Sequence, residues 1–382
     1  MNKLTLIIFL IFNATTFLCA SPEINARTAI LIDFNSNKTI YELNPDKVIY
    51  PASMTKIMTS IIAFDLLKDK KISLDDKYIV SEKAWRMSQS GYSSMFIMIN
   101  DQISVDDLLK GIIIASGNDA CVTLAEGIAG TEENFVEMMN EKAEELGMTN
   151  TTFGNSSGID GVSNLSTVRD IALMSKYLIK EHPDFYKLYA EKTFTWDRTG
   201  GESIKQFNRN TLINKGIGVD GIKTGFLSLE KYSLASSMKK ESRRLIAVGS
   251  GFETKKLRVS QSLKLLSWGF RNSDTYEVAK KNETSFEVRT WLGKENNVKV
   301  TTKENIYITL NKKDSRTYKV ILDYKGPVIA PIKKNDQIAT INIFVNNKKV
   351  KTAPLYAVDN VKKINFLKSL FTSMNYLIWG DV

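Results

Sequence analysis

The chain has 382 residues, of which 43% are hydrophobic, 25% charged and 10% aromatic, with only 21 Gly and 7 Pro. This composition excludes a disordered, collagen-like or disulfide-stapled protein, and the length indicates about two domains. The formal net charge of +10 suits an anionic partner, such as a cell-wall polymer or a lipid surface, as well as it suits general solubility.

Histidine and cysteine are too scarce for several common chemistries. The chain has one His, His182, and two Cys, Cys19 and Cys121. A Ser-His-Asp triad could form only around His182, and a His/Cys zinc site is excluded. We therefore expect no metal and no cofactor. Because Pro183 follows His182 in a charged stretch, we interpret this histidine as a solvated residue at a helix end.

The first twenty residues are typical of a secretory signal. Lys3 precedes an apolar run at 4–12, and small residues surround the predicted cleavage site after Ala20. Cleavage would remove Cys19 and leave Cys121 alone, so no intramolecular disulfide is expected. Export also disfavours a nucleic-acid partner.

Residues 21–275 are predicted to form one α+β domain. The pattern predicts a hairpin from two strands at 28–33 and 39–43, and later strands at 232–237 and 244–250. Apolar spacing predicts helices at 54–67, 105–114, 120–129, 132–146, 167–179 and 254–268. Ser166 is the expected N-cap of the fifth helix, with Asp170 in its first turn. We expect the first and last strands to meet in one antiparallel sheet.

Residues 276–360 are predicted to form a second, small all-β domain. Apolar and polar residues alternate at 297–301, 306–310, 318–324 and 337–345. Such regularly spaced strands are typical of a sandwich or a barrel.

The tail at 361–382 is predicted to be an amphipathic helix. Its apolar stripe is formed by Ile364, Leu367, Phe371, Met374 and Ile378. Such a helix can lie flat in a membrane interface or pack on the β domain, and the periodicity alone leaves both open.

Three short motifs carry the candidate chemistry. Ser-x-x-Lys occurs at Ser53, Ser228, Ser236 and Ser237, but only Ser53 begins a buried helix, where Lys56 lies one turn away on the same face. Further along come Ser116-Gly117-Asn118, after an apolar run, and Lys223-Thr224-Gly225, where a strand is expected.

In this order and context the motifs resemble the penicillin-recognising serine enzymes, in particular the D-alanyl-D-alanine carboxypeptidases, or low-molecular-mass penicillin-binding proteins. The segments that carry the resemblance are Pro51-Ala52-Ser53-Met54-Thr55-Lys56, Ser116-Gly117-Asn118-Asp119-Ala120, Phe207-Asn208-Arg209-Asn210 and Val219-Asp220-Gly221-Ile222-Lys223-Thr224-Gly225. The likeness covers about residues 26–270 and implies a transpeptidase/β-lactamase-like catalytic domain.

A lysine can replace histidine as the base beside a serine if burial or nearby positive charge keeps its amine neutral. Lys56, with Lys223 expected nearby, fits both conditions. We predict that Lys56 takes the proton of Ser53 as Ser53 attacks the bond between two D-alanines.

The resemblance assigns the other roles. Ser116 would relay the proton to the leaving amine, and Asn118 would orient Lys56 and hold the substrate amide. The backbone N–H groups of Ser53 and Phe226 would form the oxyanion hole.

The resemblance also implies a positive site for the substrate carboxylate, formed by Lys223, Thr224, Gly225 and Arg258. The implied partners are the peptide stems of peptidoglycan and β-lactam antibiotics. The expected location is the extracytoplasmic face of the membrane.

One departure and three alternatives accompany this interpretation. Glu230-Lys231 stands where the family usually has a small Ala-Gly pair, which puts substrate range and turnover in doubt. The chain could instead be a D,D-endopeptidase or a non-catalytic wall-binding protein. A class A β-lactamase is disfavoured, because no Glu-x-x-Leu-Asn lies between Ser116 and Lys223.

Overall fold

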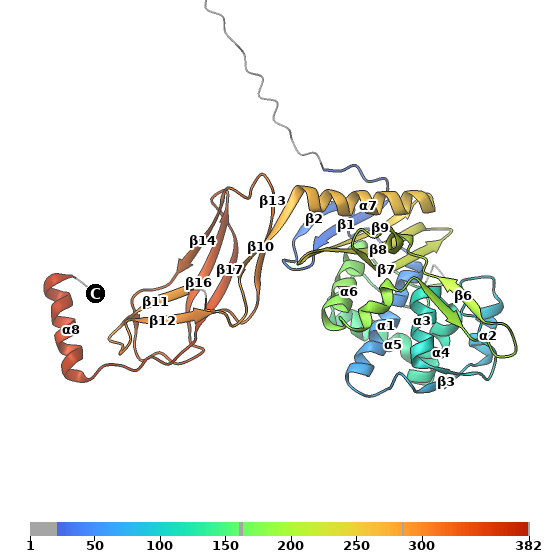
Figure 1. Cartoon of the computed structure of the whole chain (residues 1–382), viewed down its shortest axis with the longest axis horizontal. Coiled ribbons are helices and arrows are strands. Elements are labelled where there is room, and N and C mark those ends of the chain that lie inside the picture. Colours follow the sequence, from blue (N-terminus) through green and yellow to red (C-terminus); the bar gives the residue numbers. More distant parts are fainter. Residues whose placement is uncertain (1–20, 160–162, 285, 381–382) are drawn as a thin grey trace, which may run out of the picture.

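The computed structural model describes residues 21–159, 163–284 and 286–380, and the predicted export signal at residues 1–20 lies outside them. The described chain is elongated. A larger domain of helices and strands lies at one end, an all-β domain follows, and a short helix lies at the other end (Figure 1).

A five-stranded antiparallel sheet runs through the larger domain in the order β2-β1-β9-β8-β7. Its strands are β1 (Thr28–Asp33), β2 (Thr39–Leu43), β7 (Val219–Leu227), β8 (Lys231–Lys240) and β9 (Arg243–Phe252). Because β1 pairs with β9, the first and last strands do meet in one sheet, as predicted. Strand β7 forms an edge of this sheet.

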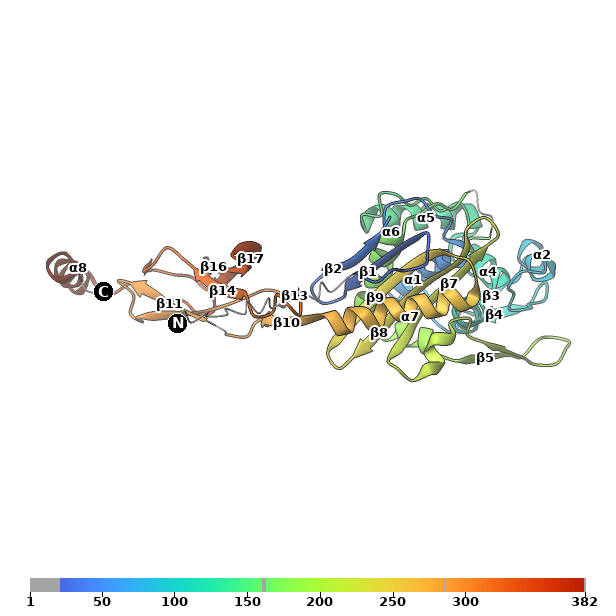
Figure 2. The same ribbon diagram turned by 90° about the horizontal axis from the view of Figure 1, so that it is seen from above.

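The two faces of the sheet pack against different helices, because successive side chains of a strand point to opposite faces. Along β1, Ala29 and Leu31 belong to the core under α7 (Lys255–Asn272), whereas Ile30 and Ile32 belong to the core that contains α1 (Lys56–Lys68). Figure 1 shows α7 above the sheet and the other helices below it, and Figure 2 shows α7 lying along the sheet from above.

The remaining helices of this domain are α2 (Glu82–Gln89), α3 (Val105–Lys110), α4 (Asn118–Ala129), α5 (Glu132–Glu145) and α6 (Val168–Glu181). Its short elements are the 3-10 turns η1 (Ala52–Thr55), η3 (Phe185–Ala190) and η4 (Thr211–Lys215), and the strand pairs β3 (Lys77–Ile79) with β4 (Gln102–Ser104) and β5 (Thr193–Trp196) with β6 (Ile204–Phe207).

One predicted helix start is wrong, and the last turn of one predicted helix is not α-helical. The N-cap of α6 is Thr167, whose hydroxyl accepts from the Asp170 N–H at 3.1 Å. Ser166 instead pairs with Ile49 in an isolated β-bridge, so the chain is still extended there. The helix predicted to end at residue 114 is α3 followed by a π-helical turn, Gly111–Ala115.

The interpretation of His182 as a solvated residue is wrong. His182 does follow the end of α6, but it is buried, with its Nε2 2.8 Å from Asp65 Oδ1 on α1. The rings of Phe64, Tyr177 and Phe185 surround it. The charged sequence neighbours form more exposed pairs, Glu181 with Lys68 at the end of α1 and Asp184 with Lys187.

The second domain is all-β, as predicted. Its strands are β10 (Ser273–Ala279), β11 (Phe286–Trp291), β12 (Asn297–Thr301), β13 (Ile306–Asn311), β14 (Tyr318–Asp323), β15 (Val328–Ile329), β16 (Gln337–Val345) and β17 (Lys348–Ala357). They form a six-stranded sheet, in the order β14-β16-β17-β12-β11-β15, and a two-stranded ribbon of β10 and β13. All four strands predicted here are present, while the domain boundaries at 275 and 360 stay predictions.

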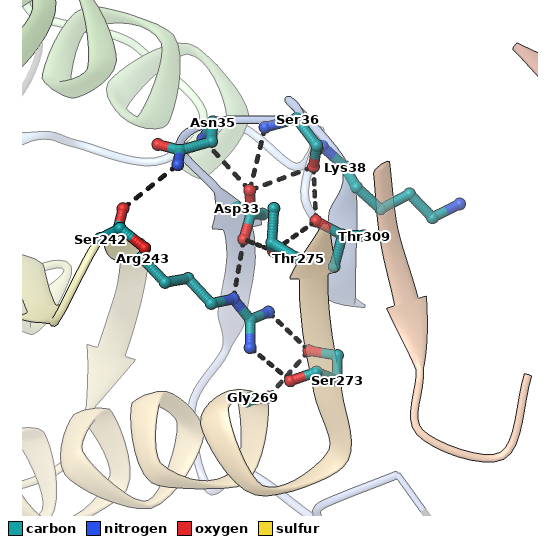
Figure 3. Close-up of polar contacts among 10 residues, drawn as sticks. All are labelled: Asp33, Asn35, Ser36, Lys38, Ser242, Arg243, Gly269, Ser273, Thr275 and Thr309. Atoms are coloured by element: carbon teal, nitrogen blue, oxygen red, sulfur yellow. Dashed lines mark hydrogen bonds and ion pairs between the residues drawn. The ribbon is translucent and has the colours of Figure 1, made fainter. Parts of the chain in front are cut away.

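The carboxylate of Asp33, at the end of β1, joins the two domains (Figure 3). Its two oxygens accept hydrogen bonds from Arg243 on β9, from Thr275 on β10 and from the turn after β1. Thr275 in turn bonds to Thr309 on β13 at 2.8 Å. Asp33 is fully buried, so its hydrogen bonds to both domains are shielded from water.

The terminal helix α8 (Phe366–Trp379) has no buried residue. Leu367, Phe371 and Leu377 are 68%, 67% and 82% exposed, so most of the apolar stripe does not pack on the β domain, although the ring of Tyr376 contacts that of Trp291 on β11, with 5.2 Å between the ring centres. Within the described ranges, no helix is both long and apolar enough to cross a bilayer.

Candidate active site

A cavity of about 840 Å³ opens beside the edge strand β7 of the larger domain. Most residues predicted from the motifs line it: Ser53, Ser116, Asn118, Thr224, Gly225, Phe226 and Arg258. The other two predicted residues, Lys56 and Lys223, are only 1% and 2% exposed and are not part of the lining. The three motifs therefore come together from distant parts of the sequence.

Ser53 and Lys56 lie one turn apart because η1 runs directly into α1. Lys56 Nζ lies 3.1 Å from Ser53 Oγ. It also lies 2.7 Å from both Asn118 Oδ1 and the carbonyl oxygen of Ser157. The amine is thus in hydrogen-bond contact with the hydroxyl and is fixed by two further oxygens.

The surroundings of Lys56 favour a neutral amine. Burial lowers its pKa, against an opposing effect of nearby groups that include the Asp119 carboxylate. A neutral amine has two N–H donors and one lone pair. Asn118 Oδ1 and the Ser157 carbonyl can only accept, so they take the two N–H groups and leave the lone pair facing the Ser53 hydroxyl.

The Ser116-Gly117-Asn118 motif lies between the π-helical turn and α4. Ser116 has φ +65°, a left-handed conformation that is uncommon outside glycine. The buried Asp119 carboxylate accepts from the N–H groups of Met95 and Phe96 and from Ser94 Oγ. The Asp119 carboxylate therefore holds residues 94–96 against the start of α4, directly after the Ser116-Gly117-Asn118 motif.

The Lys-Thr-Gly motif lies within β7, later in the strand than the sequence indicated. Thr224, Gly225 and Phe226 line the cavity along the edge of the sheet. Burial lowers the pKa of Lys223 well below its usual value, and repulsion from Lys56 lowers it further whenever the Lys56 amine is protonated. An unpaired strand edge offers N–H and C=O groups to an extended peptide.

Arg258 is not a solvated helix residue, although it lies on α7. It is 7% exposed and lines the cavity, with its guanidinium carbon 5.7 Å from the centre of the Tyr232 ring. Burial lowers its pKa, but a guanidinium stays charged at any physiological pH. Arg209 and Lys255 also line the cavity and add positive charge to this wall.

Sequence reasoning missed two groups that fix Lys56 and its surroundings. The Ser157 carbonyl belongs to the backbone, so no residue type could signal its role. Asp119 belongs to the segment Ser116-Gly117-Asn118-Asp119-Ala120, but the sequence assigns it no role. Only its burial in the structure shows that it fixes the loop. Across the described ranges, no three His, Cys, Asp or Glu side chains are grouped so that they could hold a metal ion.

Comparison with known proteins identifies the family. The profile of the D-alanyl-D-alanine carboxypeptidases, peptidase family S11, matches residues 15–254. This chain belongs to that family. The profile of the C-terminal domain of penicillin-binding protein 5 matches residues 274–363. The first match confirms the resemblance drawn from the motifs, and the second covers the predicted all-β domain.

Individual relatives agree over nearly the whole chain. D-alanyl-D-alanine carboxypeptidase DacC of Escherichia coli is 38% identical over 366 residues, 94% of this chain and 90% of the relative. DacA of Haemophilus influenzae is 37% identical over 353 residues, 92% of this chain and 88% of the relative.

The crystal structure of penicillin binding protein 5 from H. influenzae has a TM-score of 0.82 at 37% identity, covering 90% of this chain and 99% of that one. The chain is thus a serine-type D-alanyl-D-alanine carboxypeptidase with the two-domain fold of penicillin-binding protein 5.

Proposed function

We propose that this carboxypeptidase removes the terminal D-alanine from the pentapeptide stems of peptidoglycan through an acyl-enzyme on Ser53. The observation that carries the proposal is the buried Lys56 amine, held 3.1 Å from Ser53 Oγ by two oxygens that can only accept. In this arrangement a lysine can do the work of a histidine.

The first step transfers the Ser53 proton to Lys56 Nζ while Ser53 Oγ attacks the carbonyl carbon of the penultimate D-alanine. The carbonyl oxygen becomes negative and accepts hydrogen bonds from the N–H groups of Ser53 and Phe226. Ser53 lies in the first turn of a helix, where N–H groups have no partner within the helix.

The second step breaks the C–N bond and releases D-alanine. Ser116, in the cavity wall beside Asn118, passes a proton from Lys56 to the leaving amine. Water then attacks the Ser53 ester while Lys56 accepts a proton of that water. The ester C–O bond breaks, Lys56 returns the proton to Ser53 Oγ, and the shortened stem leaves as a carboxylic acid. Asn118 keeps Lys56 in place throughout.

The substrate carboxylate is held at the positive wall of the cavity. Thr224 and Arg258 face it directly, and Lys223 lies buried behind them. An extended peptide along the free edge of β7 would place its last residue at this wall. β-Lactams would acylate Ser53 in the same position as the substrate.

The protein would act outside the cytoplasm, on the face of the membrane where peptidoglycan lies. The exposed apolar side chains of α8 fit an interfacial helix, with Lys362, Lys363 and Lys368 close to its start. Figure 1 places α8 and the catalytic domain at opposite ends of the molecule. The β domain would therefore hold the active site away from the membrane.

Labelled penicillin tests the nucleophile. The full chain should take one label on Ser53, and Ser53→Ala should take none. Ser236→Ala is the matched control, because Ser236 is a buried serine three residues before a lysine but lies on β8. Label retained by Ser53→Ala would overturn the assignment.

The substrate decides between the alternatives. Release of D-alanine from a pentapeptide supports the proposal, while opening of cross-linked dimers alone would make the protein a D,D-endopeptidase. Rapid turnover of penicillin would indicate a β-lactamase. Binding of wall fragments with no acylation would indicate a non-catalytic protein.

Sedimentation with liposomes tests the anchor. The mature chain should sediment with anionic vesicles, and a chain ending at residue 360 should stay in the supernatant. Leu367→Glu with Phe371→Glu should have the same effect, whereas Thr372→Glu should change it less, because it removes no large apolar group. Unchanged sedimentation of the shortened chain would refute the anchor.

A further inference from the structure

Glu230 is a buried carboxylate beside the active site. It lies in the turn between β7 and β8 and is 2% exposed, although glutamate is rarely buried unless it is paired. It is also the residue that stands where the family usually has a small one. Its side chain does not line the substrate cavity. Direct contact with the substrate therefore does not explain why a carboxylate is buried at position 230.

The two oxygens of Glu230 bind three separate segments of the chain. Oε2 accepts from the guanidinium of Arg27 and, at 3.1 Å, from the Tyr50 N–H. Oε1 accepts from Ser250 Oγ at 2.6 Å. Arg27 also donates to the Val48 carbonyl at 3.2 Å. Glu230 and Arg27 thus clamp residues 48–50 against the sheet.

This clamp lies next to both predicted oxyanion donors. Tyr50 precedes the nucleophile Ser53 by three residues, and Glu230 follows Phe226 by four. Ser53 and Phe226 lie on different segments, so their N–H groups can converge on one oxygen only if the two segments are held in register. Binding of the Tyr50 N–H by Glu230 is a direct link between them.

The segment between Tyr50 and Ser53 contains a strained residue, which the Glu230 link helps to hold in place. Ala52 has φ +50°, a left-handed conformation that costs roughly 1–3 kcal/mol for a residue other than glycine. The same segment packs tightly on β7: a Cβ on Gly225 would lie 2.9 Å from the Pro51 carbonyl oxygen. Contact and clamp together hold Ser53 at the edge of β7.

We propose that Glu230 is a positioning residue for acyl transfer, which sets the distance between the Ser53 and Phe226 N–H groups by tying the Tyr50 backbone to the β7–β8 turn. The inference rests on the proposed function, because it takes these two groups as the oxyanion hole. An oxyanion hole that is displaced by a fraction of an ångström stabilises the transition state less, with little effect on binding of the ground state.

Two conservative variants separate position from charge. Glu230→Asp keeps the charge but is shorter by one methylene, roughly 1.5 Å, so it cannot reach Tyr50 and Ser250 together. Glu230→Gln keeps the length and an oxygen for Tyr50 but loses the charge. Positioning predicts that Glu230→Asp loses about tenfold or more in kcat, with KM within about threefold. Glu230→Gln should stay within about threefold of the wild type.

Kinetic constants are expressed per active site, counted from the final level of penicillin label, so misfolded protein does not enter them. Lys231→Gly is the matched control, because Lys231 is exposed, directly follows Glu230 as the first residue of β8 and has φ +65°. It should keep the wild-type kcat. Thermal unfolding is measured alongside.

The outcomes are distinct. A lower Tm with unchanged kcat in Glu230→Asp would show a merely structural role and overturn the inference. A larger loss in Glu230→Gln than in Glu230→Asp would mean that charge matters and position does not, which also overturns it. If the wild type neither takes label nor releases D-alanine, the proposed function has failed instead.

Discussion

Charged groups are buried in two regions of the larger domain, with opposite consequences. In the active site, the amine of Lys56 is in contact with Ser53, Asn118 and a backbone carbonyl, all of them neutral, and burial lowers its pKa. At the domain junction, the carboxylate of Asp33 is paired with Arg243 and ringed by further donors (Figure 3). Burial makes a group reactive where it lacks an opposite charge and structural where it has one.

The two regions belong to opposite ends of the same strand. Arg27, immediately before β1, bonds to Glu230 near the active site, and Asp33 is the last residue of β1. Six residues of strand span roughly 20 Å. Substitutions in one region should therefore leave the other nearly unchanged, and this separation can be tested.

The largest effect is expected for Lys56. Lys56→Met removes the proton acceptor, so kcat for D-alanine release should fall by about 10³-fold, within the range of general-base contributions. Steady-state release from a pentapeptide measures it.

Folding of the same variant should be preserved, because methionine fills most of the space of the lysine chain. The midpoint of thermal unfolding checks this. Intact D-alanine release by Lys56→Met would refute both the mechanism and the contrast with the junction.

The next effect is expected at the junction. Asp33→Ala leaves the Arg243 guanidinium, 12% exposed, without its carboxylate, and breaking a buried pair costs about 3–5 kcal/mol. The free energy of unfolding in urea should fall by that order, while kcat per labelled site stays within about twofold.

Asp184→Ala is the control for that loss, since Asp184 is 87% exposed and pairs with an exposed lysine. Its effect should lie within about 0.5 kcal/mol. A strong loss of kcat in Asp33→Ala would show that the two ends of the strand are coupled.

The pH dependence of acylation sharpens the comparison. Only the neutral form of Lys56 accepts a proton, so the rate of acylation by penicillin should fall about tenfold per pH unit below the pKa of Lys56 and level off above it. Because burial lowers that pKa from 10.5, the plateau should begin below pH 10.5. Stopped-flow acylation between pH 5 and 11 measures it. A rate that rises without levelling would show a lysine with its ordinary pKa.

The sequence predicted the parts of this site that depend on local spacing. Ser53 and Lys56 are one helical turn apart, so a helix alone brings them together. It also predicted the sheet, because runs of β-prone residues stood at both ends of the domain. Gly221 before the third motif and Gly225 within it did not obscure its strand.

Contacts between distant segments could not be predicted. Glu230 and Arg27 are 203 positions apart, and the Ser157 carbonyl that fixes Lys56 is 101 positions away. His182 was misinterpreted for the same reason, since its charged sequence neighbours concealed a partner, Asp65, on another helix. A buried charge is recognised only once its partner is known.

A partly buried cluster around Asp65 gives the smallest expected effect. Burial raises the pKa of Asp65, but hydrogen bonds from His182, Lys142 and Tyr177 outweigh it and lower the pKa from 3.8 to about 2. The folded state thus favours the carboxylate, which contributes stability above pH 3.8 that is lost as the pH falls towards 2. After allowance for partial exposure, this contribution is about 1 kcal/mol.

Asp65→Asn should therefore lower the free energy of unfolding by about 1 kcal/mol at pH 7, and the difference from the wild type should shrink between pH 4 and pH 2. Urea unfolding at a series of pH values measures it. Asp69→Asn, at the exposed end of the same helix, is the control, and it should change the free energy of unfolding at pH 7 by no more than about 0.5 kcal/mol. A difference that is equal at pH 7 and pH 2.5 would mean that packing, and not charge, stabilises this cluster. In that case the ionic pairing that stabilises the buried Asp33 carboxylate at the domain junction would not stabilise the Asp65 carboxylate.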